Sequence, residues 1–190
     1  MKLPIIAYGD SVLRKKATDI TAEYPNLKEL IGNMFETMYG AHGVGLAAPQ
    51  IGLAIRLFVI DATSFAEDEP SLKDFKKVFI NAEIIEETGE KWSFNEGCLS
   101  IPDIREDVER KQNVTLAYFD ENWVKHQETF SGLAARVIQH EYDHIDGKLF
   151  VDKLSPLRKA MLTNRLTSIS KGLVKVDYKM KFPAIKKGRR

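Results

Sequence analysis

The chain has 190 residues, enough for one domain with a substantial hydrophobic core and no need of disulfides. Its composition, 44% hydrophobic and 29% charged, is that of a globular protein, and a net charge of +1 argues against a general nucleic-acid binder. No stretch approaches the roughly 20 apolar residues of a membrane helix. No long apolar run precedes Asp10 either, so neither a signal peptide nor a membrane anchor is expected, and we predict a cytoplasmic location.

The first predicted element is a helix that begins at Tyr24-Pro25, since proline suits a first helical turn. Gly40 and Gly43 mark its end. Apolar residues recur in it at three- and four-residue spacing, and we expect this face to pack on the core: Leu27, Leu30, Ile31, Met34 and Met38.

A glycine-rich loop, Gly43–Gly52, and a buried strand, Ile55–Ile60, come next. The segment Ala62–Lys77 is polar and acidic, which predicts a surface excursion. Three further strands are expected, the last two joined by a turn at Asp120-Glu121-Asn122: Lys77–Ile85, Val114–Phe119 and Val124–Phe130.

Two helices are predicted in the last third of the chain. Ser131 is expected to act as the N-cap of a helix over Gly132–Ile145, with Gly147 as its stop. The last helix is expected to run from Ser155-Pro156 to about Ser170.

The C-terminal residues 171–190 carry eight basic residues against a single acid, Asp177. This composition predicts a basic tail that is solvated and partly disordered. Residues 1–170 are then expected to form a single domain.

The strongest chemical signal is the sequence His140-Glu141-Tyr142-Asp143-His144. Two histidines four residues apart lie on one face of a helix, so both imidazoles can reach one metal ion. The glutamate beside the first histidine can approach a metal-activated water as a general base. The alternative is a charged helix whose histidines merely share a helical interval.

The rest of this helix favours a metal site. Leu133, Val137, His140 and His144 share one stripe, which changes from aliphatic to imidazole along its length. Such a stripe suits a metal beside an apolar substrate pocket. Because the strands precede this helix without a βαβ rhythm, we predict an α+β fold. It would have antiparallel strands packed around a central metal-binding helix, with an N-terminal helix and a C-terminal helix.

A catalytic metal site of this kind needs three protein ligands and an open position. Cys98, the only cysteine, is a better third ligand than Asp143 or Asp146, because a thiolate binds divalent metal tightly. The alternatives are a buried structural thiol and a reactive thiol. Asp143 should point partly away from the histidines and is expected to accept a hydrogen bond from a histidine N–H. Gly97 would allow close backbone approach, and the N–H of Leu99 would face whatever occupies the metal.

The glycine-rich loop follows a helix and lacks the third glycine of a dinucleotide fingerprint, so nucleotide binding is rejected. Its small residues would let a peptide backbone lie against it, and Gln50 offers a neutral amide donor suited to an oxyanion. The alternative is an ordinary tight connection between a helix and a strand.

Three segments together resemble the signature motifs of the peptide deformylase family in order, spacing and residue identity: Gly43-x-Gly45-x-Ala47-Ala48-x-Gln50, Glu96-Gly97-Cys98-Leu99-Ser100 and Gln139-His140-Glu141-x-Asp143-His144. The resemblance covers roughly residues 1–165. It implies an enzyme that hydrolyses the formyl group from the N-terminal formyl-methionine of nascent proteins and releases formate.

The resemblance also implies a role for each site residue. One divalent metal ion, natively Fe(II), with Zn, Ni or Co as other possible occupants, would be held by Cys98, His140 and His144. Glu141 would be the general base that deprotonates the metal-activated water and then protonates the leaving amine. Gln50, the N–H of Leu99 and the metal would stabilise the oxyanion.

The implied substrate contacts lie on both sides of the metal. The methionine side chain would enter an apolar pocket formed by Val44, Phe94, Leu133 and Val137. Gly45 would pair with the peptide backbone, and Arg105 would approach the carbonyls downstream.

Three further features concern the surroundings of this site. Glu96 and Arg110 resemble residues that support Gln50 and Cys98. Arg136 stands where many relatives have an apolar residue, and it is expected to alter the rim of the pocket. The excursion Ala62–Lys77 and the tail match no motif.

The implied partners are formyl-methionyl nascent peptides. The protein is expected to be a monomer and to bind no membrane. Because such peptides emerge from ribosomes, residues 171–190 are predicted to add weak electrostatic attraction to ribosomal RNA.

One alternative function is that of a zinc endopeptidase built on the same helix, which Cys98 and the missing downstream glutamate disfavour. The other is a non-catalytic metal-binding module, which leaves Glu141 and Gln50 without a function.

Overall fold

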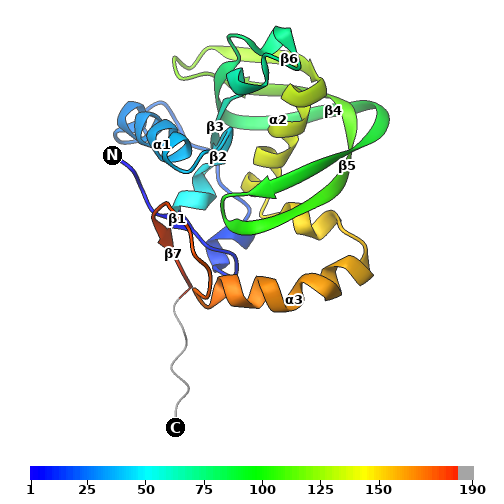
Figure 1. Cartoon of the computed structure of the whole chain (residues 1–190). Helices are drawn as coiled ribbons and strands as arrows, with labels where there is room; N and C mark the ends of the chain where they lie inside the picture. The colour runs from blue at the N-terminus through cyan, green and yellow to red at the C-terminus, as the bar shows by residue number, and fades with distance from the viewer. Residues whose placement is uncertain (184–190) are drawn as a thin grey trace.

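The computed structural model describes residues 1–183 and contains one curved antiparallel sheet with three helices (Figure 1). The strands of this sheet, in spatial order, are β2 (Gly45–Ala47), β3 (Leu57–Asp61), β4 (Lys76–Cys98), β5 (Ile101–Phe119) and β6 (Lys125–Ser131). The helices are α1 (Leu27–Gly40), α2 (Gly132–Ile145) and α3 (Pro156–Ser170). The α+β class predicted from the sequence is confirmed.

Shorter elements complete the fold. Strand β1 (Ile5–Ile6) pairs in parallel with β7 (Met180–Lys181), which brings the N-terminal segment beside the C-terminal one. Single turns of 3₁₀ helix occupy the connections: Ser11–Arg14, Ala48–Ile51, Thr63–Phe65, Pro70–Leu72 and Phe150–Lys153.

Both faces of strand β3 are buried, one against α2 and the other against α1. Phe58 and Ile60 point into a cluster that includes Ile138 of α2, whereas Leu57 and Val59 point into a cluster that includes Met34 of α1. Alternate residues of a strand face opposite sides, so one apolar run serves two cores. The sheet thus lies between α1 and α2, and its long strands curve round α2 (Figure 1).

Strands β4 and β5 are much longer than the sequence predicts, at 23 and 19 residues. In β5 the inward positions alternate regularly, but two of them hold Glu106 and Arg110, which are buried. Inward polar residues hide the period-two hydrophobic signal that identifies a strand. In β4 the segment 86–90 is exposed and polar on both faces, so it carries no such signal at all.

The start of α2 is capped by the excursion rather than by Ser131. Ser131 occupies the N-cap position but makes no side-chain cap hydrogen bond. The carboxylate of Glu69 instead accepts a hydrogen bond from the N–H of Leu133 at 3.1 Å. Leu72 of the excursion is buried at 2% exposure, so this segment is partly core and does more than cover the surface.

The expectation of a solvated tail is wrong for the described residues 171–183. Besides the pairing of β7 with β1, three side chains pack against the cluster that contains α3: Val174, Met180 and Phe182. From Val174 to Phe182, apolar and polar side chains alternate, with the partly polar Tyr178 at one of the apolar positions. This period of two indicates extended structure, and the prediction of a solvated tail overlooked it. The remaining part of the predicted tail, 184–190, lies outside the described residues.

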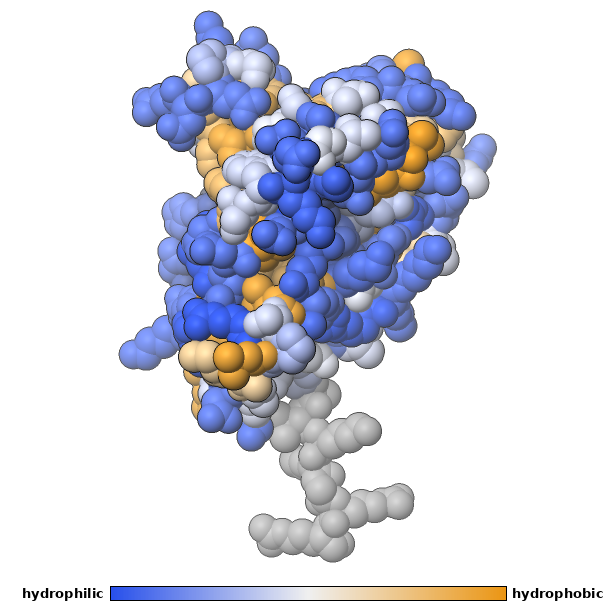
Figure 2. All heavy atoms as spheres, turned by 90° about the vertical axis from the view of Figure 1, so that its right-hand side faces the viewer, coloured by the Kyte–Doolittle hydropathy of each residue, from blue (hydrophilic) through white to orange (hydrophobic). Residues whose placement is uncertain are grey.

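Hydrophilic residues cover most of the face drawn in Figure 2, and the hydrophobic residues on it form separate small patches. No helix within residues 1–183 has the length and apolar character to cross a membrane.

The capping arrangement predicts different effects for two substitutions. Glu69→Ala should lower the free energy of unfolding by about 1 kcal/mol, because it leaves an N–H of the first turn of α2 without its acceptor. Ser131→Ala should cost less than about 0.5 kcal/mol. Urea unfolding of both variants checks this, and a larger loss for Ser131→Ala would contradict the assignment.

Candidate metal centre

Two elements bring the predicted metal ligands together. Cys98 is the last residue of β4, and a two-residue turn, Leu99-Ser100, leads into β5. The register of the two strands shifts between Gly97 and Cys98, and bulges of this kind re-aim a side chain at a strand end. His140 and His144 project from α2. Each of the three residues offers a ligand atom, and these atoms lie within 4.8 Å of one another.

The orientation of His140 is fixed by Glu96. Its Nδ1 lies 2.9 Å from the Glu96 carboxylate, which leaves Nε2 to face the cluster. Asp143 was expected to take this role, but it accepts a hydrogen bond from Arg110 at 2.7 Å instead. His144 Nε2 lies 3.3 Å from Cys98 Sγ, while its Nδ1 is buried without a hydrogen-bond partner in residues 1–183.

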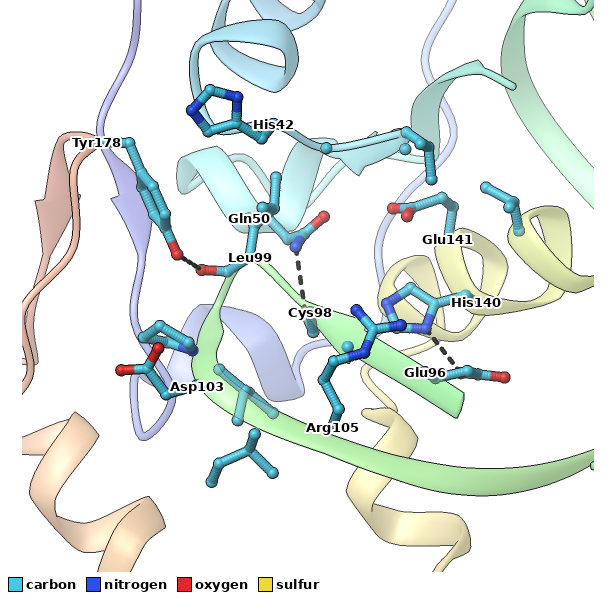
Figure 3. A pocket seen from close by; sticks show the side chains of 18 of the residues that line it. His42, Gln50, Glu96, Cys98, Leu99, Asp103, Arg105, His140, Glu141 and Tyr178 are labelled. Atoms are coloured by element: carbon cyan, nitrogen blue, oxygen red, sulfur yellow. Dashed lines mark hydrogen bonds and ion pairs between the residues drawn. The ribbon is translucent and has the colours of Figure 1, made fainter. Parts of the chain in front are cut away.

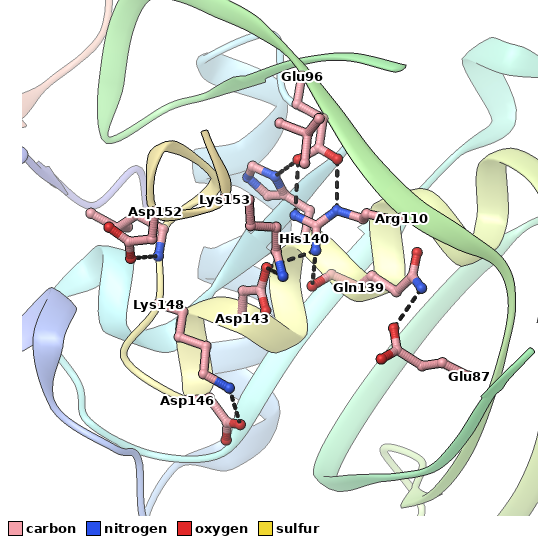
Figure 4. A network of polar contacts seen from close by, with 12 residues as sticks. Glu87, Glu96, Arg110, Gln139, His140, Asp143, Asp146, Lys148, Asp152 and Lys153 are labelled. Atoms are coloured by element: carbon pink, nitrogen blue, oxygen red, sulfur yellow. Dashed lines mark hydrogen bonds and ion pairs between the residues drawn. The ribbon is translucent and has the colours of Figure 1, made fainter. Parts of the chain in front are cut away.

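Glu96 is the centre of a buried polar network (Figure 4). Arg110 contacts both of its oxygens, at 2.7 and 2.9 Å, and Arg136 donates to one of them at 2.9 Å. Burial raises the pKa of Glu96, but hydrogen bonds from Arg110 and His140 outweigh it and hold the pKa far below its usual range. Glu96 therefore stays ionised and supports His140 rather than the expected Gln50 and Cys98.

Arg136 belongs to this network and also lines the cavity beside the site, where it was expected at the pocket rim. Its side chain is 2% exposed, it donates to the carbonyls of Trp92 and Val108, and its guanidinium lies 4.4 Å from the centre of the Trp92 ring. A buried arginine needs such partners, and here they are a carboxylate, two carbonyls and an aromatic face.

Gln50 faces the cluster from the other side (Figure 3). It lies in the 3₁₀ turn Ala48–Ile51, and its Oε1 accepts a hydrogen bond from the N–H of Ala47 at 2.9 Å. This contact orients the amide so that Nε2 points at Cys98 Sγ, 3.4 Å away, and at Ser100 Oγ, 3.3 Å away. The amide donor is thus preoriented beside the cysteine.

Glu141 fits against the glycine of β2. A Cβ atom built on Gly45 would lie 2.8 Å from the carboxyl carbon of Glu141, so only glycine leaves room for this side chain. Glu141 is buried, and its Oε2 has no hydrogen-bond partner among the described residues. Burial raises the pKa of Glu141 to about 7. A carboxylate with this pKa can both accept and return a proton near neutral pH.

A cavity of about 890 Å³ opens onto these residues. Most of the predicted site lines it, including Val44, Gly45, Phe94, Arg105 and Val137. Two predicted residues do not line it: Leu133 packs against the core, and His144 lies buried.

Several lining residues were missed because they come from segments without a motif. Phe65 belongs to the excursion, and Lys175 to Tyr178 belong to the C-terminal segment. Arg105 reaches the cavity but is held by Asn95, which accepts from its Nε at 2.9 Å.

The residues present fit a divalent metal. One thiol sulfur and two imidazole nitrogens form a donor set that suits zinc, iron or a similar ion. Burial lowers the pKa of His140, but hydrogen bonds to Cys98 and Glu96 outweigh it and raise the pKa to about 10. A metal ion would have to displace the proton from His140, whereas burial and the nearby His140 hold the pKa of His144 well below its usual range and keep that imidazole neutral.

Comparison with known proteins decides the family. The sequence model of the family described as "Polypeptide deformylase" matches residues 2–160. The chain belongs to the peptide deformylase family. It is 62% identical over 196 aligned residues to the peptide deformylase of Christiangramia forsetii, and 60% identical over 196 to that of Flavobacterium johnsoniae, with both members of each pair fully covered.

Solved structures agree. A peptide deformylase from Legionella pneumophila is 40% identical with a TM-score of 0.80, covering 91% of this chain and 98% of its own. The peptide deformylase from Thermotoga maritima is also 40% identical, with a TM-score of 0.74, covering 82% of this chain and 99% of its own. The protein is therefore an enzyme of a metal-dependent hydrolase family that removes N-terminal formyl groups.

The buried network predicts a large stability difference between two arginines. Arg110→Met should lower the free energy of unfolding by about 3–5 kcal/mol, because it removes a buried partner of Glu96 and Asp143. Arg14→Met breaks only the half-exposed pair with Asp152 and should cost at most about 1 kcal/mol. Urea unfolding measures both, and equal losses would contradict the role given to Arg110.

Proposed function

We propose that this protein hydrolyses the formyl group from the N-terminal formyl-methionine of nascent proteins, using Glu141 as general base. The observation that carries the proposal is the convergence of three groups on one cavity: the cluster of Cys98, His140 and His144, the carboxylate of Glu141 and the amide of Gln50. Hydrolysis of an amide needs an activated water, a proton carrier and an oxyanion donor, and these three groups supply them.

The three-residue cluster would hold one divalent ion. When bound, the ion would supply Lewis-acid chemistry that activates water and polarises the formyl oxygen. The family resemblance implies Fe(II), and Zn, Ni or Co also suit one sulfur and two nitrogen ligands. An Fe(II) form should lose activity in air, since iron and the thiolate of Cys98 are both oxidisable.

Glu141 is proposed to take a proton from the attacking water and to return it to the leaving amine. Its pKa, raised to about 7 by burial, suits both steps. Gln50 is proposed to donate through Nε2 to the oxyanion, together with the N–H of Leu99. The contact of Gln50 with Ala47 holds its amide in the orientation that donation requires.

The substrate methionine is proposed to enter the apolar side of the cavity. Val44, Phe94 and Val137 line it there, and Leu133 is proposed as a further wall despite packing mainly on the core. Gly45 would pair with the peptide backbone, and Arg105 would approach the carbonyls that follow. An unbranched methionine side chain adapts well to such a slot.

We propose that residues 1–170 form the catalytic domain of a cytoplasmic monomer that acts on nascent peptides.

Weak ribosome association is predicted for the basic residues of 171–190. Much of that positive charge lies in 184–190, outside the described residues. Ribosome co-sedimentation of the full-length and tail-deleted proteins at low salt would test it, and equal binding would contradict it.

The competing function is a zinc endopeptidase on the same helix. It would cleave internal peptide bonds without needing a formyl group. Unformylated peptides cut internally by the metal-loaded protein would favour it over deformylation.

The test of the proposal is formate release from formyl-Met-Ala-Ser by anaerobically purified protein, with the metal content measured on the same sample. Glu141→Ala should lower kcat by about 10²–10⁴-fold while the metal stays bound, because Glu141 is a proton carrier and not a ligand. No formate from fully metal-loaded protein would contradict the proposed reaction. Unchanged turnover in Glu141→Ala would contradict the assigned base.

A further inference from the structure

The segment Val174–Tyr178, here called the C-terminal strap, forms part of the wall of the active-site cavity. Four of its residues line the cavity: Lys175, Val176, Asp177 and Tyr178. The family model ends at residue 160, so the strap lies outside the part of the chain that carries the shared motifs.

The strap is held in place from both sides. Tyr178 donates its hydroxyl hydrogen to the carbonyl of Leu99 at 2.8 Å, next to the ligand Cys98 (Figure 3). Immediately after the strap, Met180 pairs with Ile5, and Phe182 packs on the cluster around α3. Asp177 also lies 3.3 Å from His42 across the cavity mouth. These contacts join the strap to the segments that border the cavity.

The strap lies on the side of the cavity opposite α2, and this position indicates which part of the substrate it faces. Glu141 lies at one side of the cavity, and Tyr178 lies at the other side, beyond Leu99 (Figure 3). Val137 lines the cavity from the same helix as Glu141, α2. With the formyl group beside Cys98 and the methionine side chain facing α2, a peptide that extends away from α2 runs toward the strap. The strap forms the cavity wall on that side.

We propose that the C-terminal strap binds the peptide residues that follow the formyl-methionine. This inference rests on the proposed function. The charges near it are balanced, since Lys175 and Arg105 are basic and Asp103 and Asp177 are acidic. No single charge of the substrate is therefore selected, and the ligand is an extended peptide of at least three residues. The strap makes the enzyme favour longer substrates.

The test compares formyl-Met-Ala with formyl-Met-Ala-Ser-Ala in three variants. Lys175→Ala and Tyr178→Ala remove side chains that line the cavity. Lys179→Ala is the matched control, because it belongs to the same exposed stretch but does not line the cavity. Melting temperatures of all variants show whether each still folds.

The measured quantity is the ratio of kcat/KM for the longer peptide to kcat/KM for the shorter one. It should fall about three- to ten-fold in Lys175→Ala and Tyr178→Ala, since contacts to residues absent from formyl-Met-Ala affect only the longer peptide. Lys179→Ala should keep the ratio of the unaltered protein.

An unchanged ratio in the first two variants, or equal losses on both peptides, would overturn the inference and leave the strap a structural element. Failure of the unaltered protein to release formate from either peptide is a distinct result. It would contradict the proposed function, and the inference with it.

Discussion

The ionised carboxylate of Glu96 is the constraint on which the rest of the site depends. It comes from β4 two residues before Cys98, receives Arg110 from β5 and Arg136 from α2, and accepts from His140. A carboxylate so deeply buried would be costly without these partners. With them, one group fixes the strand that carries the thiol relative to the helix that carries the imidazoles. The geometry of the candidate metal centre is therefore set by a polar network and not only by hydrophobic packing.

The parts of the fold that the sequence predicts well are those specified locally. Helix α2 begins at Gly132 and ends at Ile145, as expected, because a hydrophobic stripe and a glycine stop lie within the segment itself. The long arm of β4 was missed because residues 86–90 are polar and exposed, and that of β5 because its inward residues include Glu106 and Arg110. Those charges are buried only because partners far along the chain neutralise them, and a local pattern cannot show this.

The same distinction applies to the site. Cys98, His140 and His144 were chosen by ligand chemistry and helical spacing, and the structure brings their ligand atoms together. Helix geometry correctly turned Asp143 away from the histidines but could not reveal Arg110 as its partner. The cap supplied by Glu69 and the wall supplied by the strap come from segments with no motif, so only the three-dimensional fold shows their contact with the site.

We propose that one sulfur and two nitrogen atoms from Cys98, His140 and His144 hold the metal. X-ray absorption spectroscopy at the metal edge of anaerobically purified protein tests it most directly. If the ion is zinc, we expect one sulfur neighbour at about 2.3 Å and two imidazole nitrogens at about 2.0–2.1 Å, with similar shells for iron. A first shell of oxygen and nitrogen without sulfur would contradict it.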